Sequence, residues 1–341
     1  MNLKRYHLTA AAVLLSVGLS GCGGADVSSG TTTKSIANVV PGALGDQSFY
    51  DDAQSGVAEL ESNGYKTTTL QADANNPAQW KANLQSVSTG QWGLVVMGSS
   101  TAADTMAETA QKFPNQHYLF YDGEIQAPNV ASLTYKQNEG SFLAGVLAAL
   151  VATDPKDFPL SSGSKTIGLV GGMDIPVIND FVSGFKAGAT AVDPTVKVLT
   201  SYVGSFSDSA KGYDQAKAMF DQKADVVYQV AGGAGIGVLQ AAKDARKYAI
   251  GVDSNQNKVQ SGHVLASMLK HVGTSIVQAS QENEKGTLAF GKTQSFGLAN
   301  DGVGLVYDDN GGLVPQSVVA KVDDYKKKVV SGEIKVPTVL D

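Results

Sequence analysis

The stretch that decides the fold covers residues 166–192 and reads TIGLVGGMDIPVINDFVSGFKAGATAV. It begins with the apolar run Thr166–Val170, which is typical of a strand buried on both faces of a parallel sheet. Two glycines and a short turn follow. Pro176 then stands where a helix is expected to begin, because proline is tolerated in the first helical turn. The stretch therefore predicts one strand–loop–helix unit.

The same alternation recurs along the chain. Amphipathic segments lie between short apolar runs; for example, Ala53, Val57 and Leu60 recur at helical spacing. Strand–helix alternation of this kind predicts a doubly wound α/β architecture. Strands are expected at Ile36–Val40, Tyr65–Leu70, Leu94–Met97, Tyr118–Tyr121, Thr166–Val170, Val196–Tyr202, Val226–Val230 and Ala249–Val252.

The alternating strands and helices form two sets, at about residues 35–135 and 164–253. Between them, segment 154–165 is rich in Pro, Ser and Gly and is expected to be a surface loop. Two similar α/β units imply a cleft between them. Ligands of such sheets bind beyond the carboxyl ends of the strands. We therefore expect binding residues directly after the strands.

Composition excludes several classes of function. The chain has 341 residues, 26 Lys and Arg, 32 Asp and Glu, and a net charge of -6, which disfavours nucleic acid as a partner. The single cysteine, Cys22, allows neither an internal disulfide nor a cysteine-based metal site. The four histidines are scattered along the sequence, so we expect no metal site.

Residues 1–21 are interpreted as a secretory signal, with Lys4 and Arg5 before the apolar segment Leu8–Leu19. The sequence Leu19-Ser-Gly-Cys22 resembles a bacterial lipobox, in which the cysteine is lipidated. An ordinary cleaved signal with a chance cysteine is the alternative. The small, polar residues of segment 22–34 indicate a flexible tether, and we expect an extracytoplasmic protein held at the cell membrane by its lipid alone.

Eight motifs carry a family resemblance over almost the whole chain from about Ser35. In order they are DQSF, FLAG, GGMDIPV, SFSDSAKG, GGAGIG, GVDSNQ, SMLK and GLANDGVG. Together they resemble the basic membrane protein family, also called the Med or PnrA-like lipoproteins. The resemblance implies a substrate-binding protein of an ABC transporter with a type I periplasmic-binding fold, in which two doubly wound, Rossmann-like lobes surround a ligand cleft. Many members bind nucleosides.

For this fold we place lobe 1 at residues 35–136 plus about 255–292, and lobe 2 at 137–254 plus about 293–341. The residues expected to bind the ligand follow the predicted strands or match family positions. They are Asp46, Ser48, Phe49, Tyr50, Gly98, Asp122, Phe181, Phe206, Gly232, Gly233, Asp253 and Lys270.

The aromatic and charged members of this set have different expected roles. Aromatic rings can stack on a flat base, a role that the resemblance implies for Phe49, Phe181 and Phe206; alternatively, these rings fill the core at helix starts. Carboxylates accept hydrogen bonds from vicinal ribose hydroxyls. The resemblance points to ribose recognition by Asp122, Gly232 or Gly233, Asp253 and Lys270. The alternatives are helix caps or Asx-turns for the aspartates and a solvated side chain for Lys270.

Two departures from the family lie in the first strand–helix loop. Nucleoside-binding members commonly carry an aspartate at the start of this loop, where this chain has Val40-Pro41 and is one residue shorter. They also commonly carry asparagine where this chain has Tyr50. In the family these polar groups help to read the base edge. We therefore expect the ribose end of the site to be retained and the base end to differ.

Enzymatic motifs are incomplete, so we expect neither catalytic residues nor a cofactor. The GGAGIG loop lacks dinucleotide spacing. Ser267-Met-Leu-Lys270 is not followed by S-D-N or K-T-G. The expected function is capture of a nucleoside, with purine nucleosides favoured, by a monomer that serves an ABC permease. The alternatives are a ligand-sensing subunit for a membrane receptor, a binding protein for a non-nucleoside small molecule, and a ligand-free adhesin.

Overall fold

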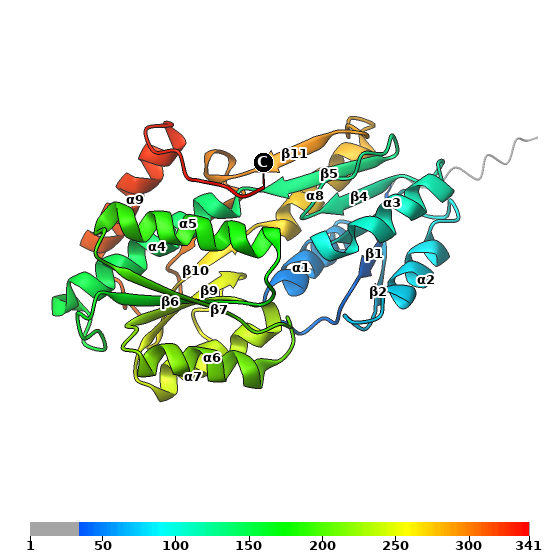
Figure 1. Ribbon diagram of the computed structural model, residues 1–341. Helices are drawn as coiled ribbons and strands as arrows, with labels where there is room; N and C mark the ends of the chain where they lie inside the picture. Colours follow the sequence, from blue (N-terminus) through cyan, green and yellow to red (C-terminus); the bar gives the residue numbers. More distant parts are fainter. Residues whose placement is uncertain (1–33, 341) are drawn as a thin grey trace, which may run out of the picture. The chain divides into compact units, whose positions relative to one another are not determined.

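The computed structural model describes residues 34–340, in which the first of two six-stranded sheets has the order β11-β5-β4-β3-β1-β2 (Figure 1). All neighbouring strands of this sheet are parallel. Its strands are β1 (Ser35–Val40), β2 (Lys66–Gln71), β3 (Leu94–Gly98), β4 (Tyr118–Tyr121), β5 (Val130–Tyr135) and β11 (Thr293–Phe296).

The second sheet has the order β12-β10-β9-β8-β6-β7. Its strands are parallel except for β12, which pairs with β10 in the antiparallel direction. The strands are β6 (Thr166–Gly171), β7 (Lys197–Tyr202), β8 (Val226–Val230), β9 (Tyr248–Asp253), β10 (Val264–Lys270) and β12 (Val303–Val306).

Helices cover both faces of the first sheet, and its central strands β1, β3 and β4 are buried throughout. On one face α1 (Phe49–Ser62) packs against α8 (Val272–Glu284), and on the other α2 (Pro77–Val87) packs against α3 (Ala103–Lys112). Successive residues of β4 serve the two faces: Leu119 and Tyr121 join the α1 side, whereas Tyr118 and Phe120 join the α2 side. This alternation follows from the two-residue period of a strand.

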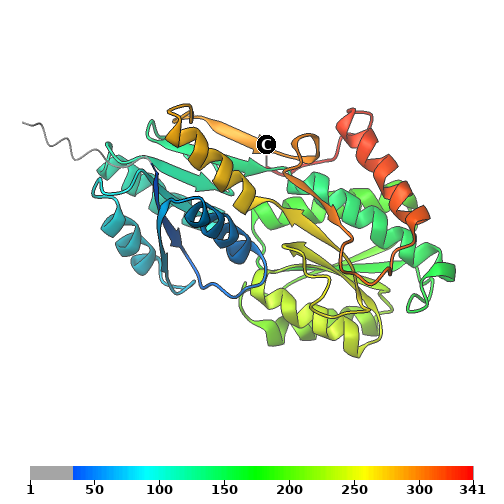
Figure 2. The same ribbon diagram turned by 180° about the vertical axis from the view of Figure 1, so that it is seen from behind.

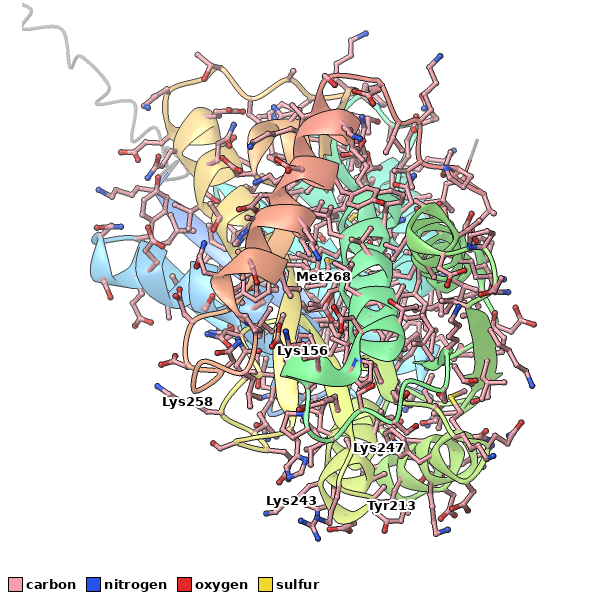
Figure 3. The ribbon with its side chains drawn as sticks, turned by 90° about the vertical axis from the view of Figure 1, so that its left-hand side faces the viewer. Lys156, Tyr213, Lys243, Lys247, Lys258 and Met268 are labelled. Carbon is pink, nitrogen blue, oxygen red and sulfur yellow. The ribbon has the colours of Figure 1, made fainter. Side chains whose placement is uncertain are left out.

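The second sheet is covered in the same way (Figures 1 and 2). On one face lie α4 (Gln137–Thr153) and α5 (Pro176–Val192), and on the other lie α6 (Ser209–Asp221) and α7 (Gly235–Asp244). The last helix, α9 (Gln316–Val330), packs on α4. Gly188 lets α4 and α5 approach closely, since a Cβ there would lie 1.9 Å from the Phe142 carbonyl oxygen. Met268 of β10, which is labelled in Figure 3, is fully buried, and its sulfur lies 2.6 Å from where a Cβ at Gly140 of α4 would be.

The chain passes between the two sheets three times. It crosses after β5 at Lys136, after β10 at His271, and after β11 through the 3₁₀ helix η4 (Leu298–Asn300). The backbone N–H of Lys136 donates to the Phe296 carbonyl (2.7 Å), and that of His271 donates to the Gly302 carbonyl (3.1 Å). The three crossings are therefore held side by side. The other described 3₁₀ helices are η1 (Ser100–Ala102), η2 (Pro155–Asp157) and η3 (Gly232–Ala234).

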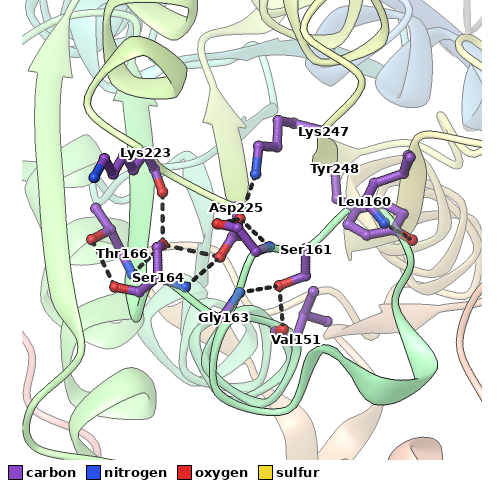
Figure 4. Close-up of polar contacts among 11 residues, drawn as sticks. Val151, Leu160, Ser161, Gly163, Ser164, Thr166, Lys223, Asp225, Lys247 and Tyr248 are labelled. Carbon is purple, nitrogen blue, oxygen red and sulfur yellow. Dashed lines mark hydrogen bonds and ion pairs between the residues drawn. The ribbon is translucent and has the colours of Figure 1, made fainter.

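The buried carboxylate of Asp225, just before β8, fixes the segment that was expected to be a surface loop (Figure 4). It accepts hydrogen bonds from the backbone and hydroxyl groups of Ser162 and Ser164, and pairs with the Lys247 ammonium at 2.6 Å. Burial by itself would raise the pKa of Asp225, but these donors outweigh it and hold the pKa below its ordinary value. The cluster is a structural anchor at the amino end of the second sheet.

The doubly wound α/β architecture predicted from the sequence is confirmed, and each of the eight expected strands is present within one residue of its expected ends. The lobe boundaries differ in part from the expected ones. Strand β10, placed with lobe 1 by the range 255–292, belongs to the second sheet, whereas β11 belongs to the first. The reason is that sheet membership depends on pairing with distant strands. The signal, Cys22 and all of the tether except Lys34 lie outside the described residues.

Candidate ligand-binding site

A cavity of 660 Å³ lies at the carboxyl ends of the strands of both sheets. Loops after β1, β2, β3 and β4 line it from the first sheet, and loops after β6, β7, β8 and β9 line it from the second. This is the position expected for a ligand site in an α/β protein. The predicted binding residues that line it are Asp46, Phe49, Tyr50, Asp122, Phe181, Phe206, Gly232, Gly233, Asp253 and Lys270.

Lys270 is the central charge of the cavity. Its side chain is only 2% exposed, and its ammonium forms an ion pair with Oδ1 of Asp122. The ammonium also lies over the rings of Phe49 (5.3 Å) and Phe181 (5.5 Å), within the range of cation–π attraction. The expected alternative of a solvated lysine is therefore wrong.

Asp122 and Asp253 occupy equivalent positions in the two sheets. Asp122 directly follows β4 and Asp253 ends β9, and both have a φ of 64° in the left-handed region that aspartate tolerates. One oxygen of each has a partner: Oδ1 of Asp122 pairs with Lys270, and Oδ2 of Asp253 accepts from the Ser48 hydroxyl at 2.6 Å. Oδ2 of Asp122 and Oδ1 of Asp253 accept no hydrogen bond from the described residues, so each can receive one from a ligand.

The pKa values of these two carboxyls reflect their burial. Burial raises the pKa of Asp253 to about 7, although the nearby Lys270 ammonium and the hydrogen bond from Ser48 pull it down. Burial likewise raises the pKa of Asp122 against the opposing effect of Lys270. The buried Lys270 ammonium therefore lowers the pKa of both buried carboxyls.

Aromatic faces lie on both sides of the cavity. Phe49 begins α1 and contacts the rings of Tyr50 and Tyr121 at centroid distances of 5.2 and 5.5 Å. Phe206, from the loop after β7, is half-buried and lies close to Gly172, where a Cβ would be 2.3 Å from the ring. The cavity is thus lined by phenylalanine rings from both sheets.

Two polar residues of the first loop already have partners within the protein. The Asp46 carboxylate accepts hydrogen bonds from the backbone N–H groups of Ser48, Tyr50 and Asp51 at 2.9–3.1 Å, which caps the start of α1. The Tyr50 hydroxyl donates to the Pro41 carbonyl at 3.3 Å. Both residues line the cavity, but these contacts leave them less able to bond a ligand.

Two predicted residues do not line the cavity. Ser48 is fully buried, and its hydroxyl donates to Asp253. Gly98 ends β3 against the Tyr121 ring, since a Cβ there would lie 2.2 Å from the ring. The structure places both residues behind the cavity lining.

Some lining residues were not predicted. Ala72, Asp73, Ala74 and Asn75 follow β2, and Ser99 follows β3 with a φ of 85°. Ligands of such sheets bind beyond the carboxyl ends of the strands, and this strand-end rule could have identified the 72–75 loop, because the strand before it was expected. No sequence motif, however, drew attention to that loop. The left-handed backbone of Ser99 is unusual for a residue other than glycine, and no sequence pattern signals it.

Residues 34–340 hold neither a metal-ligating cluster nor a membrane-spanning helix. That part of the chain contains no group of three His, Cys, Asp or Glu side chains that could hold a metal ion. Within the same range, every helix is too short or too polar to cross a bilayer.

Comparisons with known proteins identify the family of the chain. The model of the family "ABC transporter substrate-binding protein PnrA-like" matches residues 33–339. The ABC transporter nucleoside-binding protein BmpA of Lactococcus lactis is 33% identical, over 98% of this chain and 99% of its own length. Basic membrane protein D of Borreliella burgdorferi is 29% identical, over 89% of this chain and 88% of its own length.

The fold also matches a solved structure of an ABC transporter solute-binding protein from Aeropyrum pernix. The TM-score is 0.80 at 25% identity, and the match covers 90% of this chain and 94% of that one. Such proteins bind and release their substrate without converting it. The expectation drawn from the eight motifs is confirmed: the chain belongs to the PnrA-like family of ABC transporter substrate-binding proteins.

Proposed function

We propose that this substrate-binding protein captures a nucleoside, with purine nucleosides favoured, and presents it to its ABC permease. The observation that carries the proposal is the pair of strand-end carboxylates, Asp122 and Asp253, which line the cavity beside the buried Lys270, each with one oxygen that accepts no hydrogen bond from the described residues. The nucleoside-binding relative from Lactococcus lactis adds support.

The ribose fits the charged end of the cavity. Vicinal hydroxyls donate well to ionised carboxylates, and Oδ2 of Asp122 and Oδ1 of Asp253 offer two acceptors from opposite sheets. Lys270 offers a donor to a sugar oxygen. A free base would leave Oδ2 of Asp122 and Oδ1 of Asp253 without a ligand donor, at a cost of about 1–3 kcal/mol for each unmet hydrogen bond.

The base fits between the phenylalanine rings. Stacking on Phe49 or Phe206 is worth about 1–3 kcal/mol for any base, because every base has a π face. Few side chains are free to read the base edge, since Asp46 caps α1 and the Tyr50 hydroxyl is bonded to Pro41. We therefore propose that the site requires the ribose and tolerates changes of base.

Lobe closure and a lipid anchor complete the proposal. The three adjacent crossings between the sheets form a hinge, and closure of the lobes around the ligand would create the form that the permease recognises. A diacylglycerol on Cys22 would hold the monomer at the outer face of the membrane. No observation favours the alternative of a sensor subunit over a transport receptor.

Calorimetry with a ligand panel tests the proposal. The panel contains adenosine, guanosine, inosine, uridine, their 2′- and 3′-deoxy forms, and the free bases. Loss of one hydroxyl should cost about 1–3 kcal/mol of binding free energy, and at least two of the base changes should cost less than that. Asp122→Asn and Asp253→Asn should each reduce the penalty for a deoxy ligand.

Asp174→Asn is the matched control, because Asp174 also follows a strand but does not line the cavity. It should bind the panel as the wild type does. If free bases bind as tightly as ribosides, the assignment of the two carboxylates to ribose is wrong. If nothing in the panel binds, the ligand belongs to another class of small molecule.

A further inference from the structure

The segment after β9 hydrogen-bonds directly to the loop before α1, which belongs to the other sheet. Asp253 accepts from the Ser48 hydroxyl at 2.6 Å, and the Ser254 hydroxyl donates to the Ser48 carbonyl at 3.0 Å. The Gln256 amide Nε2 donates to the Gln47 carbonyl at 2.9 Å. These contacts join the two lobes next to the cavity, and every donor and acceptor in them belongs to the protein.

The side chain of Gln256 is fixed by its own lobe. It is 1% exposed, and its Oε1 accepts from the Gln229 side chain (2.6 Å) and from the Val252 backbone (3.0 Å). Its backbone N–H donates to the buried Ser267 hydroxyl at 2.9 Å. Gly251 leaves room for this arrangement, because a Cβ there would lie 2.7 Å from Oε1 of Gln256. The amide is therefore held in place to present Nε2 to the opposite lobe.

A hydrogen bond between preorganised groups has little entropy to lose when it forms. Bonds of this kind can hold the lobes together before any ligand enters. The apparent affinity of a ligand scales with the fraction of the protein that is already in the closed, binding-competent form. A protein that is partly closed without ligand therefore binds its ligand more tightly than one that is almost entirely open.

We propose that Gln256 is a positioning residue that, together with Ser254, holds the two lobes together by hydrogen bonds. These bonds set the fraction of the ligand-free protein that is in the closed form. The inference rests on lobe closure, the binding mode proposed above, but it holds for any ligand. It assigns a role to the end of the GVDSNQ motif that ligand contact leaves unexplained, since Ser254 and Gln256 do not line the cavity.

Gln256→Glu is the most selective perturbation. The substitution keeps Oε1 as acceptor for Gln229 and Val252, but places an oxygen where Nε2 faces the Gln47 carbonyl. Ser254→Ala is milder and removes only one contact between the lobes. The matched control is Gln260→Glu, which changes the charge equally and removes an amide donor to Gln240 (2.8 Å) within the same lobe.

The distance between the lobes is measured by double electron–electron resonance on the full chain without ligand. Spin labels are placed at Asp104→Cys on α3 and Lys243→Cys on α7, with Cys22→Ser so that the labels are unique. Both sites are exposed, and Lys243 lies at the surface in Figure 3. Ser254→Ala should raise the ratio of open to closed forms about fivefold, as expected for one net hydrogen bond, and Gln256→Glu should raise it further.

The control Gln260→Glu should keep the wild-type distance distribution. The proposal is overturned if Ser254→Ala and folded Gln256→Glu also keep it, since the contacts would then be a pivot that persists in the open form. If Gln256→Glu does not fold, Ser254→Ala decides the question alone. Because no ligand is present, a failure of nucleosides to bind would overturn the proposed function and leave this measurement unaffected.

Discussion

Replacing Lys270 with methionine should damage the site through the charges that it leaves behind. The substitution keeps an apolar side chain of similar length beneath the rings of Phe49 and Phe181. It removes the one cation that lines the cavity among residues 34–340, beside Asp122 and Asp253. Both acids are then buried without a counter-charge.

The size of the effect follows from two estimates. Breaking a buried ion pair by removing one partner costs about 3–5 kcal/mol of unfolding free energy. The orphaned Asp122 can instead take up a proton; from its ordinary pKa of 3.8, this costs about 4 kcal/mol at neutral pH. The two routes agree. Asp122→Asn alone should cost less, because Lys270 retains Asp253 as a nearby charge.

Urea denaturation of the ligand-free protein measures these differences in a double-mutant cycle. The double variant Lys270→Met with Asp122→Asn should be more stable than Lys270→Met alone, because it no longer buries an unpaired Asp122. The stability of Lys270→Met should also improve as the pH falls and the acids become protonated. A double variant no more stable than the single one would refute the view that Lys270 balances Asp122.

Four further predictions concern separate parts of the chain. Phe49→Ala and Phe206→Ala should each weaken nucleoside binding in calorimetry by about 1–3 kcal/mol. Each should lower the stability of the ligand-free protein by less than the roughly 3–5 kcal/mol that loss of a core phenylalanine costs. A large loss of stability with unchanged affinity would assign the rings to the core. The pKa of Asp253 is raised to about 7, so its contribution to stability is present below its ordinary pKa of 3.8 and lost as the pH rises through about 7. Thermal melts of wild type and Asp253→Asn across that window check the sign. Asp225→Asn should cost about 3–5 kcal/mol in denaturant titrations, because it leaves the largely buried Lys247 ammonium without its ion-pair partner. Affinity should be unchanged, because Asp225 does not line the cavity. Cys22→Ser should abolish labelling by a fatty-acid probe, and a labelled variant would contradict the lipobox.

Some of the strands and the sheet membership of the later elements could not be predicted locally. Strand β5 was not expected, and β11 and β12 have only four residues each, too few for a clear apolar pattern. The placement of β10 in the second sheet depends on its pairing with β9 and β12. Pairing between distant strands leaves no trace in the local sequence of either one.

The candidate site was likewise only partly predictable from the sequence. The strand-end rule and the family motifs brought Asp122, Asp253 and Lys270 forward from the sequence, and the structure places all three in the cavity lining. The hydrogen-bond partners of the predicted site residues could not be predicted from the sequence. Asp46 caps a helix, and Ser48 bonds to a residue 205 positions away.

The sequence by itself determined the architecture and the edge of the sheets where a ligand would bind. Those features follow from short-range periodicity, which any buried strand or amphipathic helix must obey. Only the tertiary structure decided which polar atoms are satisfied within the protein and which face the cavity. Hydrogen bonds such as that from Gln256 to Gln47 depend on ångström-scale distances between segments that meet only when both lobes have folded.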